Sequence, residues 1–318
     1  MKKLLLVSTA VAILFASCQK NNLTTDAAGT PTQRNCSSME VLAAQMKADP
    51  TLEARLQAAE DAVQNNLRNN VNARLVNGVI EIPVVVNVLY RTTAENISQA
   101  QIQSQIDVLN EDFNATNTDF SLVPSTFSGV KANVGIRFVL DQVIRKSTTK
   151  TSWKTDDAMK KSSKGGINPT SPTTKLNLWV CTLSGGILGY AQFPGGSSAT
   201  DGVVILNKGF GRTGTAAAPY NKGRTATHEV GHWLNLRHIW GDATCGSDLV
   251  SDTPTHNTAN YGCPAAGHKS TCTGTPIEMT MNYMDYTDDA CMYMFSTGQK
   301  SRILATFATG GPRATFAQ

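Results

Sequence analysis

The residues best suited to chemistry in this chain lie in the stretch 225–242, TATHEVGHWLNLRHIWGD. If this stretch is helical, His228 and His232 face the same side one turn apart, with Glu229 beside them. Two imidazoles spaced in this way can bind Zn²⁺, and an adjacent carboxylate can accept a proton from a water molecule on the metal. The spacing therefore predicts a zinc-dependent hydrolytic site.

A third imidazole, His238, sharpens this interpretation. In a continuous helix it would lie roughly 80° from the face of His228 and about 15 Å further along the axis, too far to share one ion. The chain must therefore turn sharply after His232. Asn235 stands at the turning position, and Asn is second to Gly in adopting positive φ. The alternative is an amphipathic core helix whose histidines only pack.

These residues resemble the H-E-x-x-H-x-x-G-x-x-H signature of metzincin metalloproteases, with Asn235 in place of the usual glycine. The sequence HEVGHWLNLRH and the later sequence MNYMDYTDDACMYMFSTGQ are most similar to the pappalysin family, and within it to its small, ulilysin-like members. The similarity is strongest from about Ile80 to the C-terminus. It implies an α/β (α+β) zinc endopeptidase acting on proteins or peptides. A twisted mixed sheet, a backing helix and the active-site helix would form the upper half, up to about residue 238, above a loop-rich lower half.

The resemblance also assigns roles to three residues near the C-terminus. Met284 matches the methionine of the family's Met-turn, an apolar floor beneath the zinc histidines. Tyr286 is implied to donate its phenol to the developing oxyanion, with plain packing as the alternative. Asp289 matches an acidic position that lines the pocket after the scissile bond and favours Arg or Lys there, since a buried carboxylate suits a guanidinium. Asp288 is its close competitor.

Two other zinc proteins are possible alternatives. A thermolysin-like site would take its third ligand from a glutamate on a later helix, but Glu278 is the only glutamate after His232, and it lacks a helical apolar repeat around it. A non-catalytic surface lipoprotein that binds peptide or matrix would hold zinc only structurally. Structural zinc normally has four protein ligands, and outside the N-terminal region only three are evident.

The N-terminus predicts export. Residues 1–17 combine two lysines with an apolar run that is too short for a membrane span, which is typical of a signal peptide. The following Cys18 closes a bacterial lipoprotein box, so we expect a lipid anchor in the cell envelope, with simple secretion as the alternative. Outside the cytoplasm the cysteines can oxidise. Residues 18–35 are polar, and we expect a tether there.

Residues 36–74 are predicted to be a prosegment, with helical apolar spacing over 37–66. Cys36 stands just before this helical region, and a thiolate is a good zinc ligand. We expect Cys36 to fill the fourth zinc position in a latent zymogen, similar to the cysteine switch in parts of the metzincin clan. The alternatives are an idle thiol or a disulfide with Cys181. Activation would then require a cut in the polar region 65–77, near Arg74.

Residues 75–318 are predicted to form the catalytic domain. β-Branched and apolar runs predict strands at 79–90, 136–141 and 175–181, with shorter ones within 185–194 and 201–207. Ser98 and Gln101 predict a capping box at the start of a backing helix, and Ser296 and Gln299 predict another at the last helix. In the family the 185–194 strand edges the cleft and pairs with extended substrate; an ordinary edge strand is the alternative.

Four cysteines follow His238 in a segment poor in regular structure, which predicts two disulfides with three possible connectivities. The resemblance implies the pairs Cys245 with Cys272 and Cys263 with Cys291.

Asp248, Asp252 and Thr253 supply hard oxygen atoms at short spacing, suitable for Ca²⁺, although solvated turn carboxylates explain them as well. The whole chain has 41% hydrophobic residues and a net charge of +4 without a dense basic run. This composition does not suggest nucleic acid as a partner.

Overall fold

A five-stranded sheet in the order β3-β1-β4-β6-β5 forms the framework of the computed structural model, which describes residues 31–71, 73 and 79–317. Its strands are β1 (Ile80–Tyr90), β3 (Ile136–Ser147), β4 (Leu176–Cys181), β5 (Gly189–Ala191) and β6 (Val203–Leu206). All pairings are parallel except that of β5, which lies antiparallel at the edge. The predicted mixed sheet is confirmed, and β3 continues six residues beyond its predicted end at residue 141.

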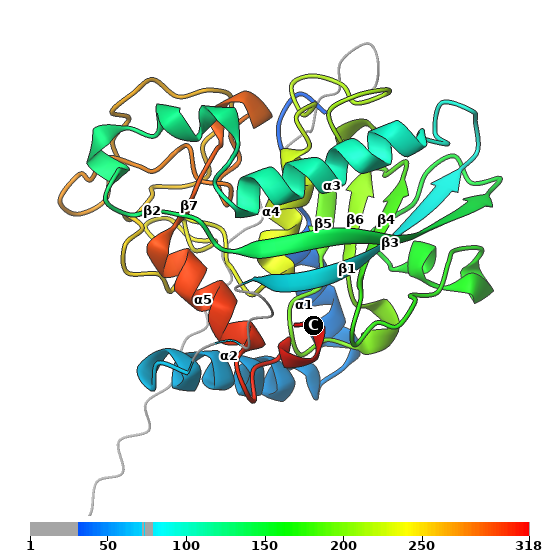
Figure 1. Cartoon of the computed structure of the whole chain (residues 1–318), viewed down its shortest axis with the longest axis horizontal. Helices are drawn as coiled ribbons and strands as arrows, with labels where there is room; N and C mark the ends of the chain where they lie inside the picture. Colours follow the sequence, from blue (N-terminus) through cyan, green and yellow to red (C-terminus); the bar gives the residue numbers. More distant parts are fainter. Residues whose placement is uncertain (1–30, 72, 74–78, 318) are drawn as a thin grey trace, which may run out of the picture.

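Two helices stack on this sheet. The backing helix α3 (Gln99–Phe113) packs along β3, and α4 (Arg224–Trp233) lies against β5, β6 and α3 (Figure 1). Ser98 caps α3 by accepting from the Gln101 N–H at 3.1 Å. The predicted capping box there is wrong, because the Gln101 amide turns away and donates to the Phe210 carbonyl at 2.9 Å. The loop that follows β6 thus competes successfully for this side chain.

The C-terminal region is built from loops around α5 (Thr297–Phe307) and the short strand β7 (Phe295–Ser296), which pairs with β2 (Lys131–Ala132) from earlier in the chain. The two disulfides Cys245–Cys272 and Cys263–Cys291 are those implied by the resemblance. The predicted capping box of Ser296 and Gln299 at α5 is confirmed. A loop-rich lower half is therefore pinned covalently.

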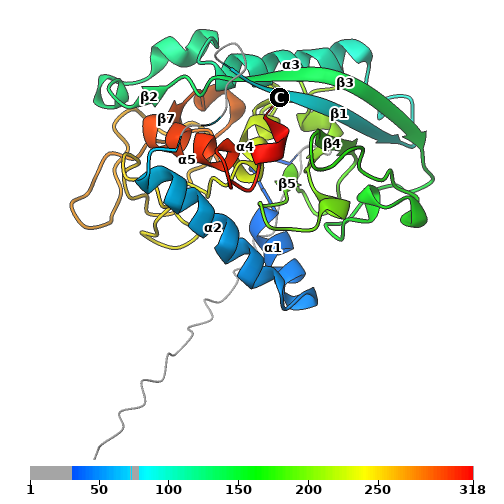
Figure 2. The same ribbon diagram turned by 60° about the horizontal axis from the view of Figure 1, so that its bottom comes forward.

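The N-terminal region forms two helices, α1 (Ser38–Ala48) and α2 (Leu52–Arg68). They are separated at Pro50, which lacks an N–H and pushes Asp49 into extended backbone, φ −131°. Figure 2 shows α1 beside β5 and α2 against α5. No helix among the described residues is both long and apolar enough to cross a membrane.

Candidate active site

The helix α4 ends in the predicted turn. All ten of its residues are buried, and Asn235 adopts φ +70° two residues after the last helical position. The Leu236 N–H then donates back to the Gly231 carbonyl at 2.9 Å, which closes the helix end. The turn brings His238 back toward the face that carries His228 and His232.

The three imidazoles meet through their Nε2 atoms. The Nε2 of His232 lies 3.2 Å from that of His228 and 3.1 Å from that of His238. Each Nδ1 is held from behind: His228 by the Tyr283 carbonyl at 2.7 Å, and His232 by the Leu236 carbonyl at 2.8 Å. A carbonyl only accepts, so Nδ1 carries the proton in both rings and each Nε2 presents a lone pair.

This arrangement fits a zinc ion by its donor chemistry. Tetrahedral zinc at 2.0–2.1 Å from each imidazole requires ligand nitrogens about 3.3 Å apart, close to the spacing of these atoms. Without a cation, lone pairs that face one another at this distance repel. Burial, then the neighbouring imidazoles, keeps the pKa of His228 well below its usual value, and that of His232 at about 3. The rings therefore stay neutral, as metal ligands must be.

Cys36 lies over this triad. Its thiol is 2% exposed, belongs to no disulfide, and can join the three histidines in one group of ligand atoms within 4.8 Å of one another. The alternative of a disulfide with Cys181 is therefore wrong, and Cys181 is a second free, buried cysteine. The Cys36 Sγ donates to Glu229 Oε2 at 3.2 Å, which also accepts from Ser38 Oγ at 3.0 Å. Burial raises the pKa of Glu229 to about 8.

The segment around Cys36 runs along the edge strand β5. Leu188 N donates to the Asn35 carbonyl and Ser37 N to the Gly189 carbonyl, both at 3.0 Å. The edge strand predicted to pair with extended chain thus pairs with this segment. The absence of a side chain at Gly189 lets Glu229 of α4 approach β5, since a Cβ there would lie 2.9 Å from Glu229 Cγ.

The floor of the site is formed by Met284 and Tyr286. A Cβ on Gly231 would lie 2.4 Å from Met284 Sδ, so the glycine within the histidine motif lets Met284 pack directly under α4. Tyr286 Oη donates to the Cys36 carbonyl at 3.0 Å and accepts from the Cys36 N–H at 3.3 Å. Both residues thus lie at the site, as the resemblance implied.

Asp289 is the base of a pocket that holds Arg34. The two residues form an ion pair of 2.6 Å with side chains 0% and 1% exposed, and the Arg34 guanidinium also lies over the Tyr220 ring, 5.0 Å from its centre. The Lys222 N–H donates to the second Asp289 oxygen at 2.8 Å. Asp288, its competitor, is only partly buried.

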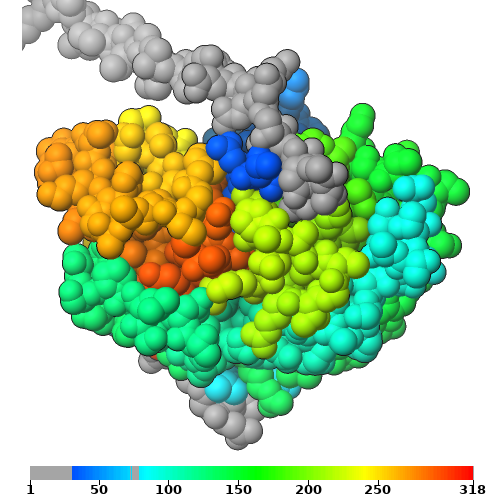
Figure 3. Space-filling view, turned by 90° about the horizontal axis from the view of Figure 1, so that it is seen from above, coloured from blue at the N-terminus to red at the C-terminus, as the bar shows by residue number. Residues whose placement is uncertain are grey.

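The docking of Arg34 corrects the predicted tether, which was expected to extend through residue 35. In Figure 3 the described start of the chain, in blue, lies between the yellow and orange C-terminal loops and the yellow-green segment that precedes α4. Arg34 was not predicted as a site residue, although a basic residue two positions before Cys36 was a signal that could have found it.

Two further carboxylates support the site without having been predicted. Asp242 accepts from His238 Nδ1 at 2.5 Å. Its position four residues after His238 could have predicted this contact. Asp112 of α3 accepts from Thr227 Oγ1 and Tyr283 Oη, both at 2.7 Å, and joins α4 to the floor. Burial raises the pKa of Asp112 to about 6. Nothing near Asp112 in the sequence indicated this contact.

The residues predicted to bind Ca²⁺ separate in the structure. Thr253 Oγ1 donates to Asp248 at 2.9 Å, so these two lie together. Asp252 points elsewhere and accepts from Ser296 Oγ at 2.6 Å and from the Gly298 N–H at 2.7 Å, at the start of α5. Its carboxylate caps that helix.

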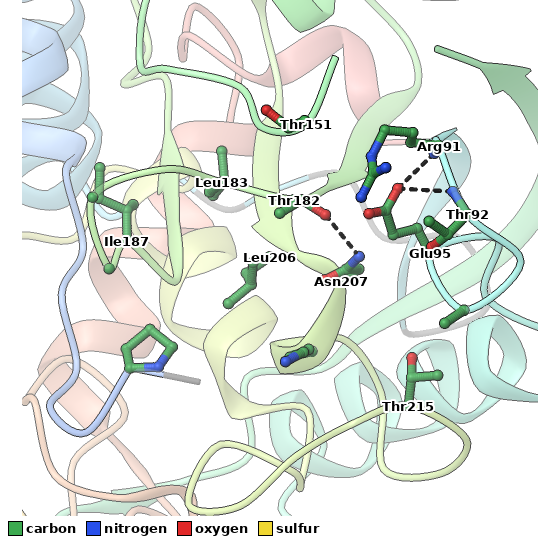
Figure 4. A pocket seen from close by; sticks show the side chains of 15 residues that line it. Arg91, Thr92, Glu95, Thr151, Thr182, Leu183, Ile187, Leu206, Asn207 and Thr215 are labelled. Atoms are coloured by element: carbon green, nitrogen blue, oxygen red, sulfur yellow. Dashed lines mark hydrogen bonds between the residues drawn. The ribbon is translucent and has the colours of Figure 1, made fainter. Parts of the chain in front are cut away.

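A cavity of about 590 Å³ opens where β1, β4 and β6 end. It is lined by Pro31 of the N-terminal segment, by the Gly185–Ile187 loop that precedes β5, and by the charged side chains of Arg91, Glu95 and Lys208. Figure 4 shows Glu95 bonded to the backbone of Arg91 and Thr92 at one side of this cavity. The path of the N-terminal segment therefore continues past the Asp289 pocket.

Other predictions fall away from this site or outside the described residues. Glu278 accepts from the Asn257 N–H and the Asn260 amide, both at 2.6 Å, and is not one of the metal-ligand group, which leaves the thermolysin-like alternative unsupported. Cys18 and Arg74 lie outside the described residues.

The comparisons with known proteins agree with this geometry. A family model described as pregnancy-associated plasma protein-A matches residues 174–308. An "Extracellular metalloprotease" of Verticillium alfalfae is 34% identical over 241 residues, covering 70% of this chain and 77% of the relative. An "Extracellular metalloprotease 1" of Coccidioides posadasii is also 34% identical, over 70% and 75% of the two chains.

Two solved structures are more similar. Mature mirolysin of Tannerella forsythia, in complex with a cleaved peptide, is 46% identical with a TM-score of 0.73, over 75% of this chain and 96% of that one. A promirolysin mutant of the same organism is 42% identical with a TM-score of 0.78, over 89% and 96%. The chain therefore belongs to the pappalysin family of metzincin proteases and is a zinc metalloendopeptidase.

Proposed function

We propose that this protein is made as a latent zymogen and hydrolyses peptide bonds that precede Arg or Lys once its prosegment, residues 36–74, is removed together with the preceding segment that carries Arg34. The observation that carries this proposal is the convergence of three imidazole Nε2 atoms beside buried Glu229, beneath Cys36. The similarity to promirolysin supports a latent form. The cleaved peptide bound to mature mirolysin supports a peptide as substrate.

His228, His232 and His238 would hold the metal. Bound Zn²⁺ supplies a Lewis acid that polarises the scissile carbonyl and acidifies water. Glu229, buried and with a raised pKa, accepts the proton of the attacking water and returns it to the leaving amine. Tyr286 donates its phenol to the oxyanion of the tetrahedral intermediate once the Cys36 backbone no longer occupies it.

Latency would follow from the position of Cys36. Its thiol would take the position that water needs on the metal, and it contacts Glu229 at 3.2 Å, so the metal and the general base would be blocked together. As a thiolate it would complete four protein ligands around zinc. Removing the segment opens the fourth position, which is what distinguishes a catalytic from a structural zinc site.

The preference for Arg or Lys rests on Asp289. Arg34 supports it, because a guanidinium already fills this pocket, paired with Asp289 and bonded to the Thr287 carbonyl at 3.1 Å. A substrate side chain would replace Arg34 there, while the substrate backbone pairs with the β5 edge. Residues further beyond the scissile bond would reach the cavity near Arg91.

The environment and activation of the protein complete the proposal. The names of its fungal relatives support secretion, and the Cys18 box supports a lipid anchor in the cell envelope. We place the activating cut near Arg74, since residues 65–68 belong to α2. Ca²⁺ remains a proposal for Asp248 and Thr253, whose oxygens lie together; metal analysis of the purified protein, with Asp248→Asn as comparison, tests it.

Digestion of a peptide library tests the function directly. The activated protein should cut before Arg and Lys, and Glu229→Ala protein prepared in the same way should leave the library intact. Cuts spread over all residue types would remove the role of Asp289 while leaving the peptidase activity. An intact library with both proteins would remove the proposed function.

A further inference from the structure

An ion pair joins helix α2 of the N-terminal region to α5, near the C-terminus. Glu60 on α2 forms a two-pronged ion pair with Arg302 on α5: its Oε1 accepts from Nη1 at 2.9 Å, and its Oε2 accepts from Nη2. The Arg302 side chain is 1% exposed and that of Glu60 17%. A shielded, bidentate pair of this kind is stronger than an exposed surface pair.

The same contact includes the turn between the histidines. The Asn235 amide donates to Glu60 Oε2 at 3.0 Å, and Arg302 Nε donates to the Asn235 carbonyl at 3.0 Å. Asn235 is the residue at φ +70° that brings His238 to its place. Glu60 is therefore bound by a side chain of α5 and by the turn residue between His232 and His238.

Arg302 needs a carboxylate in this position. Its guanidinium is buried, and Glu60 is its one acidic partner among the described residues. A buried cation that loses its partner is strongly unfavourable. Around this pair α2 packs along α5, with Val63 fully buried and the Asn66 amide donating to the Ala305 carbonyl at 3.0 Å.

These contacts are separate from those of Cys36, and they join Glu60, on the N-terminal side of the proposed cut, to Asn235 and Arg302 on its C-terminal side. Cleavage near Arg74 breaks one peptide bond beyond α2 and leaves every bond of Glu60 in place. We propose that Arg302 and Asn235 form a binding site for a helix-borne carboxylate, occupied by Glu60, that retains the prosegment after the cut. This inference rests on the proposed function in taking residues 36–74 as the prosegment. Activation then needs dissociation as well as cleavage.

The experiment uses the full-length zymogen with the recognition sequence of a specific protease in place of residues 74–78. Glu229→Gln is included in every protein, so that retention is measured without self-digestion and independently of any peptidase activity. Glu60→Gln is compared with Glu53→Gln, a matched change at an exposed glutamate of the same helix. After the cut, gel filtration at successive times measures how much prosegment still co-elutes with the catalytic domain.

The cut parent and the Glu53→Gln protein should retain the prosegment, and Glu60→Gln should release it faster by on the order of tenfold or more, since it leaves Arg302 unpaired. Adding Arg302→Gln should bring no further acceleration. Equal rates for Glu60→Gln and the parent, or immediate release from the parent, would overturn the proposal. Matching melting curves of the uncut proteins show that Glu60→Gln is folded.

The same cut proteins with Glu229 intact separate this inference from the proposed function. Prosegment retention without any peptide hydrolysis after release would remove the peptidase proposal and leave the binding site standing. Hydrolysis that begins immediately on cutting, with no retention, would remove the binding site and leave the peptidase proposal standing.

Discussion

Arg34 and Asp289 are 255 positions apart in the chain, yet they form a buried ion pair of 2.6 Å beside the three histidines. The N-terminal segment thus places in the Asp289 pocket the kind of side chain that the pocket is proposed to select. In the proposed function, the same carboxylate would serve latency by binding Arg34 and specificity by binding a basic side chain of the substrate.

Asp289→Asn should change specificity more than it changes catalysis. Truncating the charge of a buried partner costs about 2–5 kcal/mol, so kcat/KM for peptides with Arg after the scissile bond should fall by roughly 30-fold or more. Peptides with Leu there should be cut nearly as before. Parallel kinetics on both peptides measure this, and Asp288→Asn is the matched control. An equal loss on both peptides would show that Asp289 serves only the structure of the site.

Cys36→Ala should shorten latency. The zymogen would lose the thiol that covers the histidines and contacts Glu229, so peptide hydrolysis should begin earlier after purification. Cys181→Ala removes the other buried free cysteine and serves as the control. The time course of activation at fixed protein concentration measures the effect. Activation curves that coincide for all three proteins would remove the switch.

Gly231→Ala should destabilise the catalytic domain. The added Cβ would meet Met284 Sδ at 2.4 Å, and overpacking of this kind costs about 1–3 kcal/mol. Calorimetry should show a lower Tm, whereas Gly129→Ala, with nothing within 4 Å, should have little effect. Adding Met284→Ala should relieve the clash, so the double variant should be more stable than additivity predicts. Strict additivity would argue against this contact.

The contribution of Glu60 should depend on pH in one direction. Burial acts to raise its pKa, but the hydrogen bonds and charge of Arg302 outweigh burial and lower the pKa from 4.5 to about 2. A carboxyl with a lowered pKa in the bound state stabilises that state fully above its free pKa and loses the effect as pH falls toward the bound pKa.

The ratio of release rates between Glu60→Gln and the parent cut zymogen should therefore stay constant from pH 7 to about 5 and decline only below 4.5. Effects of pH on the thiol and the histidines are shared by both proteins and cancel in the ratio. A ratio that already declines between pH 7 and 5 would contradict the assigned pKa.

Much of this site could be predicted from the sequence, because the decisive signals are local. The turn at Asn235, the Ser296 capping box and the buried run of β1 depend on neighbours within a few residues. Arg34 and Glu60 could not be assigned in this way, since their partners Asp289 and Arg302 lie more than 200 positions away. Gln101 shows that local patterns can also mislead. Its side chain donates to the carbonyl of Phe210 in a distant loop and does not complete the capping box predicted from its spacing to Ser98.

The proposed mechanism requires that three histidines hold zinc and that Glu229 moves the proton. It is tested most directly by measuring zinc content and kcat/KM of Glu229→Ala protein, freed of its prosegment, against the parent. The predicted result is one zinc per chain in both proteins, with kcat/KM lower in the variant by on the order of 10³-fold. Turnover that survives in the variant, or a parent that hydrolyses peptides without bound zinc, would contradict the account.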